Sequence, residues 1–260
     1  MKNEWKDFRI PNAAAYRPVR RADFGGRGLE EQSLYISVPI GEGPHPAAVW
    51  FHGGGLTAGG QEVPDCLYDG RLIVIEARYR LSPAYPAPAA LEDAAAAVAW
   101  AMIHAEEFDI DRGRLFVGGM SAGAWLAAMV GMDGSRLARH GFDHRKLAGL
   151  FPISGQMTTH FRFKEDLHYP QSQFEPVIDR YAPLGHLCAD LPPILLVTGE
   201  SGLDMPGRPE ENALMAASLK ALGHPLVRCV HLKGCDHGAA LDNCGPALTA
   251  FLDELLEGKR

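Results

Sequence analysis

The stretch Leu115-Phe116-Val117-Gly118-Gly119-Met120-Ser121-Ala122-Gly123 decides how this sequence folds. Its first three residues form an apolar run typical of a buried strand, and the run leads into Gly119-Met120-Ser121-Ala122-Gly123. Glycines two positions before and after a serine permit a sharp turn from strand to helix, because larger side chains would collide with the neighbouring backbone. Such a turn holds the hydroxyl group clear of the sheet. We therefore predict that Ser121 is a nucleophile that can attack a carbonyl carbon.

Two further motifs follow predicted strands. His52-Gly53-Gly54-Gly55 comes directly after the apolar segment 47–51, and Cys235-Asp236-His237-Gly238 comes shortly after the apolar segment 226–230. Open α/β sheets gather their catalytic groups at the ends of their strands, so both motifs are expected near Ser121. A serine hydroxyl needs a base to take its proton, and imidazole titrates near neutrality. His237 is therefore the predicted general base.

Composition limits the class of protein. With 260 residues, 47% of them hydrophobic, the chain suits one α/β domain over residues 1–260. The formal net charge of -7 argues against a nucleic-acid partner. Without an 18-residue apolar run or an apolar N-terminus, no membrane association is expected, and we predict a cytoplasmic protein, or a secreted one whose leader has been removed. The five cysteines lack metal-ligand spacing and predict reduced thiols with no metal site.

The hydrophobic pattern alternates between strands and helices. Strands are predicted at residues 31–39, 47–51, 72–79, 115–117, 148–154, 193–199 and 227–232, and helices at residues 87–105, 121–132, 209–222 and 246–256. This alternation predicts a mostly parallel central sheet with helices on both faces. Residues 1–30 are predicted to form a loosely patterned N-terminal arm, and residues 155–191 an irregular insert.

The motifs, together with Tyr79-Arg80-Leu81-Ser82-Pro83 and the following segment 86–93, resemble the α/β-hydrolase fold and, within it, the hormone-sensitive-lipase-like esterases. The resemblance extends from about residue 31 to the C-terminus. It implies that backbone N–H groups of Gly54, Gly55 and Ala122 form an oxyanion hole, that His52 shapes the glycine loop, and that no metal or organic cofactor is needed.

The resemblance also implies a carboxylate shortly after the strand 193–199, which would orient His237. The family places this acid about three residues beyond a glycine, and here that position is Gly202, a departure from the pattern. We favour Asp204, because a loop lengthened by two residues would bring it to the required place and the chain order Ser121, Asp204, His237 fits the fold. Glu200 is the main rival. Asp236 better suits a hydrogen-bonding role within its own loop.

The expected function is that of a serine hydrolase acting on small-molecule esters of short-chain carboxylic acids. A carbohydrate acetyl or feruloyl esterase and a formamidase or amidase remain as alternatives of the same fold, as does a catalytically silent domain that only binds a ligand. Residues 155–191 are rich in aromatic side chains, which predicts that this insert either selects the substrate or simply packs against the domain. The short arm disfavours long-chain lipids. A homodimer is expected by analogy alone.

Overall fold

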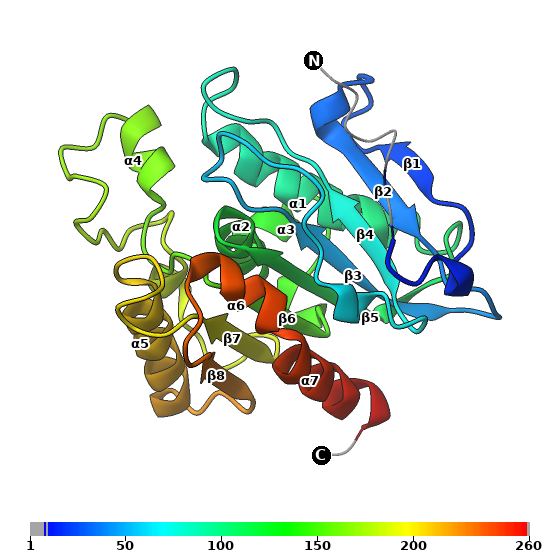
Figure 1. Ribbon diagram of the computed structural model, residues 1–260. Helices are drawn as coiled ribbons and strands as arrows, with labels where there is room; N and C mark the ends of the chain where they lie inside the picture. Colours follow the sequence, from blue (N-terminus) through cyan, green and yellow to red (C-terminus); the bar gives the residue numbers. More distant parts are fainter. Residues whose placement is uncertain (1–7, 9, 259–260) are drawn as a thin grey trace.

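The computed structural model of the protein describes residue 8 and residues 10–258. Its centre is one eight-stranded sheet with the strand order β1-β2-β4-β3-β5-β6-β7-β8 (Figure 1). The strands are β1 (Arg20–Asp23), β2 (Ser33–Ser37), β3 (His45–Phe51), β4 (Ile73–Ala77), β5 (Ile110–Met120), β6 (Gly149–Ile153), β7 (Ile194–Thr198) and β8 (Val227–His231).

Most of the sheet is parallel. Strands β4, β3, β5, β6, β7 and β8 pair in parallel, whereas β2 pairs antiparallel with both β1 and β4. Parallel neighbours direct their carboxyl ends to the same edge of the sheet, so the loops after β3, β5, β6, β7 and β8 come together there. The predicted α/β fold with a mostly parallel sheet is therefore confirmed.

Helices cover both faces of the sheet. The α-helices are α1 (Pro88–Ile103), α2 (Ala122–Met132), α3 (Gly134–Ala138), α4 (Phe161–Asp166), α5 (Arg208–Ala221), α6 (His237–Asn243) and α7 (Gly245–Glu257), and short 3-10 helices occupy 13–15, 30–32, 65–67, 144–146 and 183–186. Helices α1, α2, α3 and α5 contribute to one hydrophobic core, and α6 and α7 to the other. Within the described residues no helix is both long and apolar enough to cross a membrane.

Side chains along the central strands point alternately to the two faces of the sheet, and so contribute to two hydrophobic cores. On β3, Val49 and Phe51 face the core with α1 and α2, while Ala48 and Trp50 face the core with α6 and α7. Side chains on a strand point to opposite faces in turn, so a strand that is buried on both sides reads as a continuous apolar run. This is why the segment 47–51 was recognisable as a strand from sequence.

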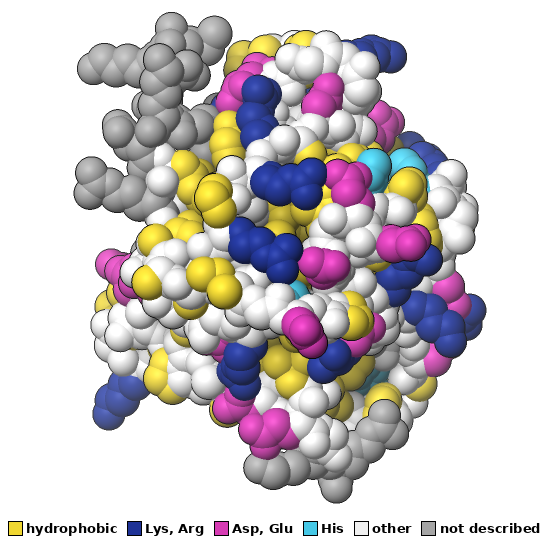
Figure 2. Space-filling view, turned by 90° about the vertical axis from the view of Figure 1, so that its right-hand side faces the viewer, with side chains coloured by type: hydrophobic (Ala, Val, Ile, Leu, Met, Phe, Trp, Pro, Cys, Tyr) yellow, Lys and Arg dark blue, Asp and Glu magenta, His cyan; other side chains and the backbone are white. Residues whose placement is uncertain are grey.

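The prediction of a loosely patterned N-terminal arm is partly wrong. Residues 1–7 and 9 lie outside the described residues, but Arg20–Asp23 forms the edge strand β1 rather than a loose segment. Three basic side chains of this region form surface ion pairs: Arg17 with Asp109, Arg20 with Glu107 and Arg21 with Glu30. Figure 2 shows basic and acidic side chains interspersed over the face that it presents. The pairing of β1 with β2 was missed because charged residues carry little strand signal.

The insert 155–191 is more ordered than the sequence suggested. It contains α4, and its residue Arg162 donates a hydrogen bond to Ser82 Oγ at 2.8 Å. Asp166 accepts one from the backbone N–H of Ala87 at 2.8 Å. The Lys164 ammonium is buried and donates to the carbonyl oxygens of Ser172 and Glu175 at 2.6 and 2.7 Å. Arg162 and Asp166 thus bind the insert to the body, and Lys164 ties together two parts of the insert; hydrophobic periodicity cannot predict such polar contacts.

Candidate active site

Ser121 stands between the end of β5 and the start of α2. Its backbone has φ 54° and ψ -111°, a conformation that costs a non-glycine residue energy unless the surroundings enforce it. The backbone N–H of Ser121 donates to Ile153 O at 2.8 Å, and its carbonyl accepts from Trp125 N at 3.1 Å, as the first hydrogen bond of α2. These bonds fix the turn, so the hydroxyl projects from a rigid support.

The glycines flanking the turn are required by close backbone contacts. A Cβ atom on Gly123 would lie 2.0 Å from the carbonyl oxygen of Phe51, at the end of β3. A Cβ atom on Gly119 would lie 2.5 Å from the backbone of Gly123. Both distances are far below van der Waals contact, so only glycine lets α2 begin this close to the sheet.

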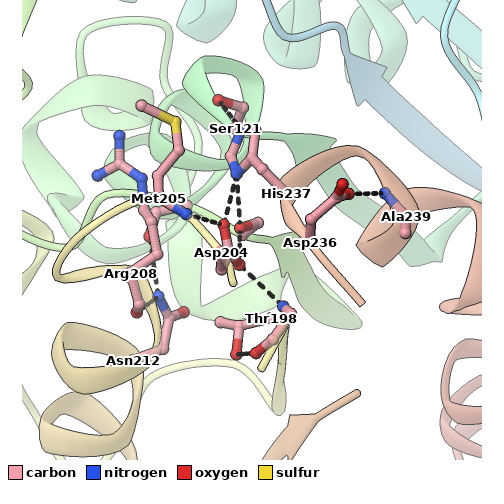
Figure 3. A network of polar contacts seen from close by, with 12 residues as sticks. Ser121, Thr198, Asp204, Met205, Arg208, Asn212, Asp236, His237 and Ala239 are labelled. Carbon is pink, nitrogen blue, oxygen red and sulfur yellow. Dashed lines mark hydrogen bonds and ion pairs between the residues drawn. The ribbon is translucent and has the colours of Figure 1, made fainter. Parts of the chain in front are cut away.

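A chain of hydrogen bonds joins residues from three loops at the carboxyl edge of the sheet (Figure 3). Ser121 Oγ lies 2.9 Å from His237 Nε2, and His237 Nδ1 lies 2.7 Å from Asp204 Oδ1. An ionised carboxylate only accepts hydrogen bonds, so Nδ1 carries the proton and Nε2 has the free lone pair. That lone pair faces the serine hydroxyl, which is the arrangement in which imidazole can take its proton.

The surroundings of Asp204 keep its carboxylate ionised. Burial acts to raise the pKa of Asp204, but hydrogen bonds from His237, Ser154 and the backbone N–H groups of Gly199 and Met205 outweigh it and lower the pKa to about 2. The two backbone donors lie 2.8 and 2.6 Å from the carboxylate oxygens. A carboxylate with this pKa holds a negative charge beside His237 throughout the neutral range, and so stabilises the imidazolium form.

Ser154 was not predicted to belong to the site. It follows β6 directly, has φ 49°, and its hydroxyl donates to Asp204 Oδ2. Because the Ser154 hydroxyl hydrogen points to Asp204, the lone pairs of Ser154 Oγ can accept a hydrogen bond from His237 Nδ1, which lies 3.0 Å away. The sequence held a signal for this role, because Ser154 is the polar residue that ends a predicted strand beside the one carrying Ser121.

The other two candidate acids lie elsewhere. Glu200 Oε2 accepts from the backbone N–H of Gly234 at 2.6 Å, which ties the loop after β7 to the loop after β8. Asp236 Oδ1 accepts from Ala239 N at 2.9 Å and caps the N-terminus of α6. His237 therefore begins a short helix instead of lying on the open loop that the sequence suggested.

The glycine loop after β3 lies against Ser121. A Cβ atom on Gly53 would be 3.4 Å from Ser121 Cβ, and Gly54 and Gly55 have φ values of 100° and 64°. The carbonyl of Gly54 accepts from Thr57 N and Ala58 N, both at 3.0 Å, which closes a tight turn. No acceptor for the N–H of Gly54 or Gly55 occurs among the residues that the structure describes.

Two side chains hold this loop in place. Glu62 Oε2 accepts from the backbone N–H of Gly53 at 2.5 Å, and burial raises the pKa of Glu62. The ring of His52 stacks on Tyr79 with 4.2 Å between centroids, and His52 Nδ1 lies 2.7 Å from Gly53 O. Burial lowers the pKa of His52 to about 4, so this imidazole is neutral at pH 7. Glu62 was missed because a single acidic residue ten positions after His52 gives no motif.

Taken together, these groups can carry out acyl transfer. The site provides a hydroxyl, an adjacent imidazole, a buried carboxylate that orients it, and a glycine loop packed against the serine. In the described part of the chain, no group of three or more His, Cys, Asp or Glu side chains is arranged to hold a metal ion.

Fold and motifs together define an α/β hydrolase. The sequence matches the family described as the alpha/beta hydrolase fold over residues 48–241, and the chain belongs to this family. The resemblance to its hormone-sensitive-lipase-like branch is confirmed.

Known relatives of the chain include esterases. The carboxylic ester hydrolase LipN of Mycobacterium tuberculosis is 47% identical over 98 residues, which cover 35% of this chain and 26% of LipN. The chain thus spans about a quarter of the length of this curated relative. A bacterial heroin esterase superposes with a TM-score of 0.73 at 25% identity, covering 98% of this chain and 87% of that one. The propionate-bound esterase Est2 of Thermogutta terrifontis superposes with a TM-score of 0.74 at 23% identity, covering 92% and 93%.

We expect Gly123→Ala to destabilise the protein severely, because the added methyl group would overlap the carbonyl oxygen of Phe51. A loss on the order of 3 kcal/mol in the free energy of unfolding is the scale of an overpacked core site. Chemical denaturation measures it. The matched control is Gly60→Ala, where a Cβ atom would meet nothing within 4 Å. Equal stability of the two variants would contradict the packing account of the turn.

Proposed function

We propose that this protein is a carboxylic ester hydrolase in which Ser121, His237 and Asp204 form a catalytic triad. The observation that carries the proposal is the continuous hydrogen-bond chain of these three side chains, at 2.9 and 2.7 Å, on a strained strand-to-helix turn. A domain that only binds a ligand has no need of a nucleophile, a base and an acid in this alignment. The esterase relatives support the same class of activity.

The reaction would begin as His237 Nε2 takes the proton of the Ser121 hydroxyl while Oγ attacks the ester carbonyl carbon. The carbonyl π electrons move onto oxygen, and the resulting oxyanion would accept hydrogen bonds from the backbone N–H groups of Gly54, Gly55 and Ala122. Fixed N–H donors of this kind commonly contribute about 3 to 4 kcal/mol each to lowering the barrier. Glu62 supports this loop from behind by binding the N–H of Gly53.

Collapse of the tetrahedral intermediate would break the bond to the alcohol, which leaves with the proton held on His237 Nε2. The acyl group then remains on Ser121 Oγ. In the deacylation step, His237 takes a proton from a water molecule and the resulting hydroxide adds to the acyl carbon. The bond from that carbon to Ser121 Oγ then breaks, and Oγ takes the proton back from His237. Asp204 stays ionised throughout, because its pKa of about 2 lies far below that of an imidazolium ion.

Short acyl chains are the favoured substrates. The cavity beside the site, lined by Phe161 and Met205 among others, has a volume of about 440 Å³ and includes polar groups, which suits compact esters better than long lipid chains. The Thermogutta terrifontis esterase, a structural neighbour, has propionate bound in one structure and butyrate in another. The fold of the chain also resembles that of a gut carbohydrate esterase, but this likeness concerns the fold alone.

Hydrolysis of p-nitrophenyl esters from acetate to decanoate tests the proposal. We expect kcat/KM to peak at short chains, and Ser121→Ala to lower kcat on the order of 10⁴-fold or more, since it removes the nucleophile. The exposed Ser201 provides a matched control, and Ser201→Ala should retain activity. If the wild-type protein cleaved no ester of any chain length, or if Ser121→Ala remained active, the proposed function would be wrong.

The choice of acid has its own test. We expect Asp204→Asn to lower kcat on the order of 10³- to 10⁴-fold, because an amide cannot hold His237 in the required tautomer or stabilise its charge. Glu200→Gln should change kcat by less than about threefold, since Glu200 binds a backbone N–H outside the site. Steady-state kinetics on p-nitrophenyl acetate compares the two. A larger loss in Glu200→Gln would reassign the acid.

A further inference from the structure

A buried cation lies next to the proposed triad, and no described residue pairs with it. Arg208, the first residue of α5, is only 3% exposed. Its Nε atom is fully buried and makes no hydrogen bond, and among the described residues no carboxylate comes within ion-pair distance of its guanidinium group. Figure 3 shows this group beside the Met205 side chain, on the same side of the network as Ser121. An unpaired charge removed from water costs several kcal/mol, so its presence needs a reason.

The acidic residues nearest to Arg208 are engaged elsewhere. Glu211 accepts from the backbone N–H groups of Met157 and Thr158 at 2.7 and 3.2 Å and from the Thr158 hydroxyl at 3.0 Å. Glu210 Oε1 accepts from Ser201 at 2.5 Å, and the oxygens of Asp204 serve the site already described. Burial opposes the charged form of Arg208 and the negative charges of Glu211 and Asp204 favour it through space, but neither carboxylate supplies the acceptor that its N–H groups lack.

Arg208 lines the cavity of about 440 Å³ that adjoins the proposed catalytic centre. Phe161, on another wall, is close to the glycine loop, since its ring carbon Cζ would lie 3.1 Å from a Cβ atom on Gly55. Met205, on a third wall, follows Asp204 in sequence. The cavity is therefore separated from the glycine loop by Phe161 and from the proposed acid by one position in sequence, so the non-reacting part of a substrate could lie in it.

A second orphaned donor lies in the segment beside this cavity. His160 is fully buried, and its Nδ1 accepts from Arg162 N at 3.1 Å, so its Nε2 carries the hydrogen. No acceptor for Nε2 is found in the described part of the chain. Burial, together with the positive charge of Arg208, holds the pKa of His160 well below its usual range, which keeps the imidazole neutral. Among the described residues, Arg208 Nε and His160 Nε2 are thus buried donors without an acceptor, beside one buried acceptor without a donor, Asn212 Oδ1.

We propose that the cavity binds a carboxylate group carried on the non-reacting end of the ester, and that Arg208 is its specificity-determining residue. The planar guanidinium group presents paired N–H donors that match a carboxylate, and the burial of its side chain strengthens such a bond. The substrate class is therefore esters that also bear a carboxylate, such as half-esters of dicarboxylic acids. This inference rests on the proposed function for its reaction, but not for its binding step.

Two matched substrate pairs test the inference. Monomethyl glutarate against methyl hexanoate places the carboxylate on the acyl side, and 4-acetoxybutanoate against pentyl acetate places it on the alcohol side. Acid release measured in a pH-stat gives kcat/KM for each ester. We expect the wild-type protein to prefer the anionic member of at least one pair by tenfold or more. A preference for the neutral member in both pairs would overturn the inference without any variant.

The role of Arg208 is tested in variants by the ratio of kcat/KM for the anionic ester to kcat/KM for the neutral ester. Arg208→Met should lower the preference for the anionic ester at least tenfold, and Arg208→Lys, which keeps the charge but loses the planar fork, should lower it less. Lys220→Met is the matched control, because it removes the same charge from an exposed position on the same helix, and should leave the ratio unchanged. An unchanged ratio in Arg208→Met, with folding verified by circular dichroism, contradicts the assignment.

Binding without turnover separates this inference from the proposed function. Monomethyl glutarate is titrated into the Ser121→Ala protein by calorimetry, and again into the protein that also carries Arg208→Met. We expect the second titration to show at least tenfold weaker binding. This result would uphold the carboxylate site even if no ester were cleaved. Absence of binding in both titrations would overturn the site while leaving the ester series to decide on the proposed function.

Discussion

The approach of α2 to the end of β3 is the constraint on which the candidate site depends. With glycine at position 123, the first turn of α2 packs against the carbonyl oxygen of Phe51, where a Cβ atom would be only 2.0 Å away. This contact fixes the turn at Ser121 and places the glycine loop after β3 against the serine. Because β3 and β5 are parallel neighbours, the same contact aligns two of the loops that form the site.

Fixed polar groups then determine what the site can do. The carboxylate of Asp204 is surrounded by four donors, which keep it ionised despite its burial and orient His237 toward Ser121. On the other side, Glu62 anchors the glycine loop through the N–H of Gly53. Arg208 differs from these groups, since nothing in the described chain satisfies it. An unpaired guanidinium group beside this network favours a substrate that carries a negative charge.

Much of the fold and of the candidate site could be predicted from sequence. Most of the features that were missed have physical reasons for carrying no sequence signal. The segments 47–51 of β3, 115–117 of β5 and 194–197 of β7 are continuous apolar runs, and the glycines around Ser121 reflect close backbone contacts at the turn. The edge strand β1 and the packing of α4 depend on charged side chains that have no periodic pattern. Glu62 and Arg208 act through tertiary neighbours, so only the assembled structure brings them to the site, whereas Ser154 had a signal in the sequence as the polar end of a predicted strand.

The most direct test of the central claim is covalent labelling of Ser121. A fluorophosphonate reacts with a serine hydroxyl only when an adjacent base activates it, and intact mass spectrometry followed by peptide mapping counts and locates the adducts. We predict a single adduct on the peptide that contains Ser121, and none in the His237→Ala protein. No adduct on the wild-type protein, or an adduct on a different serine, would contradict the account of this site.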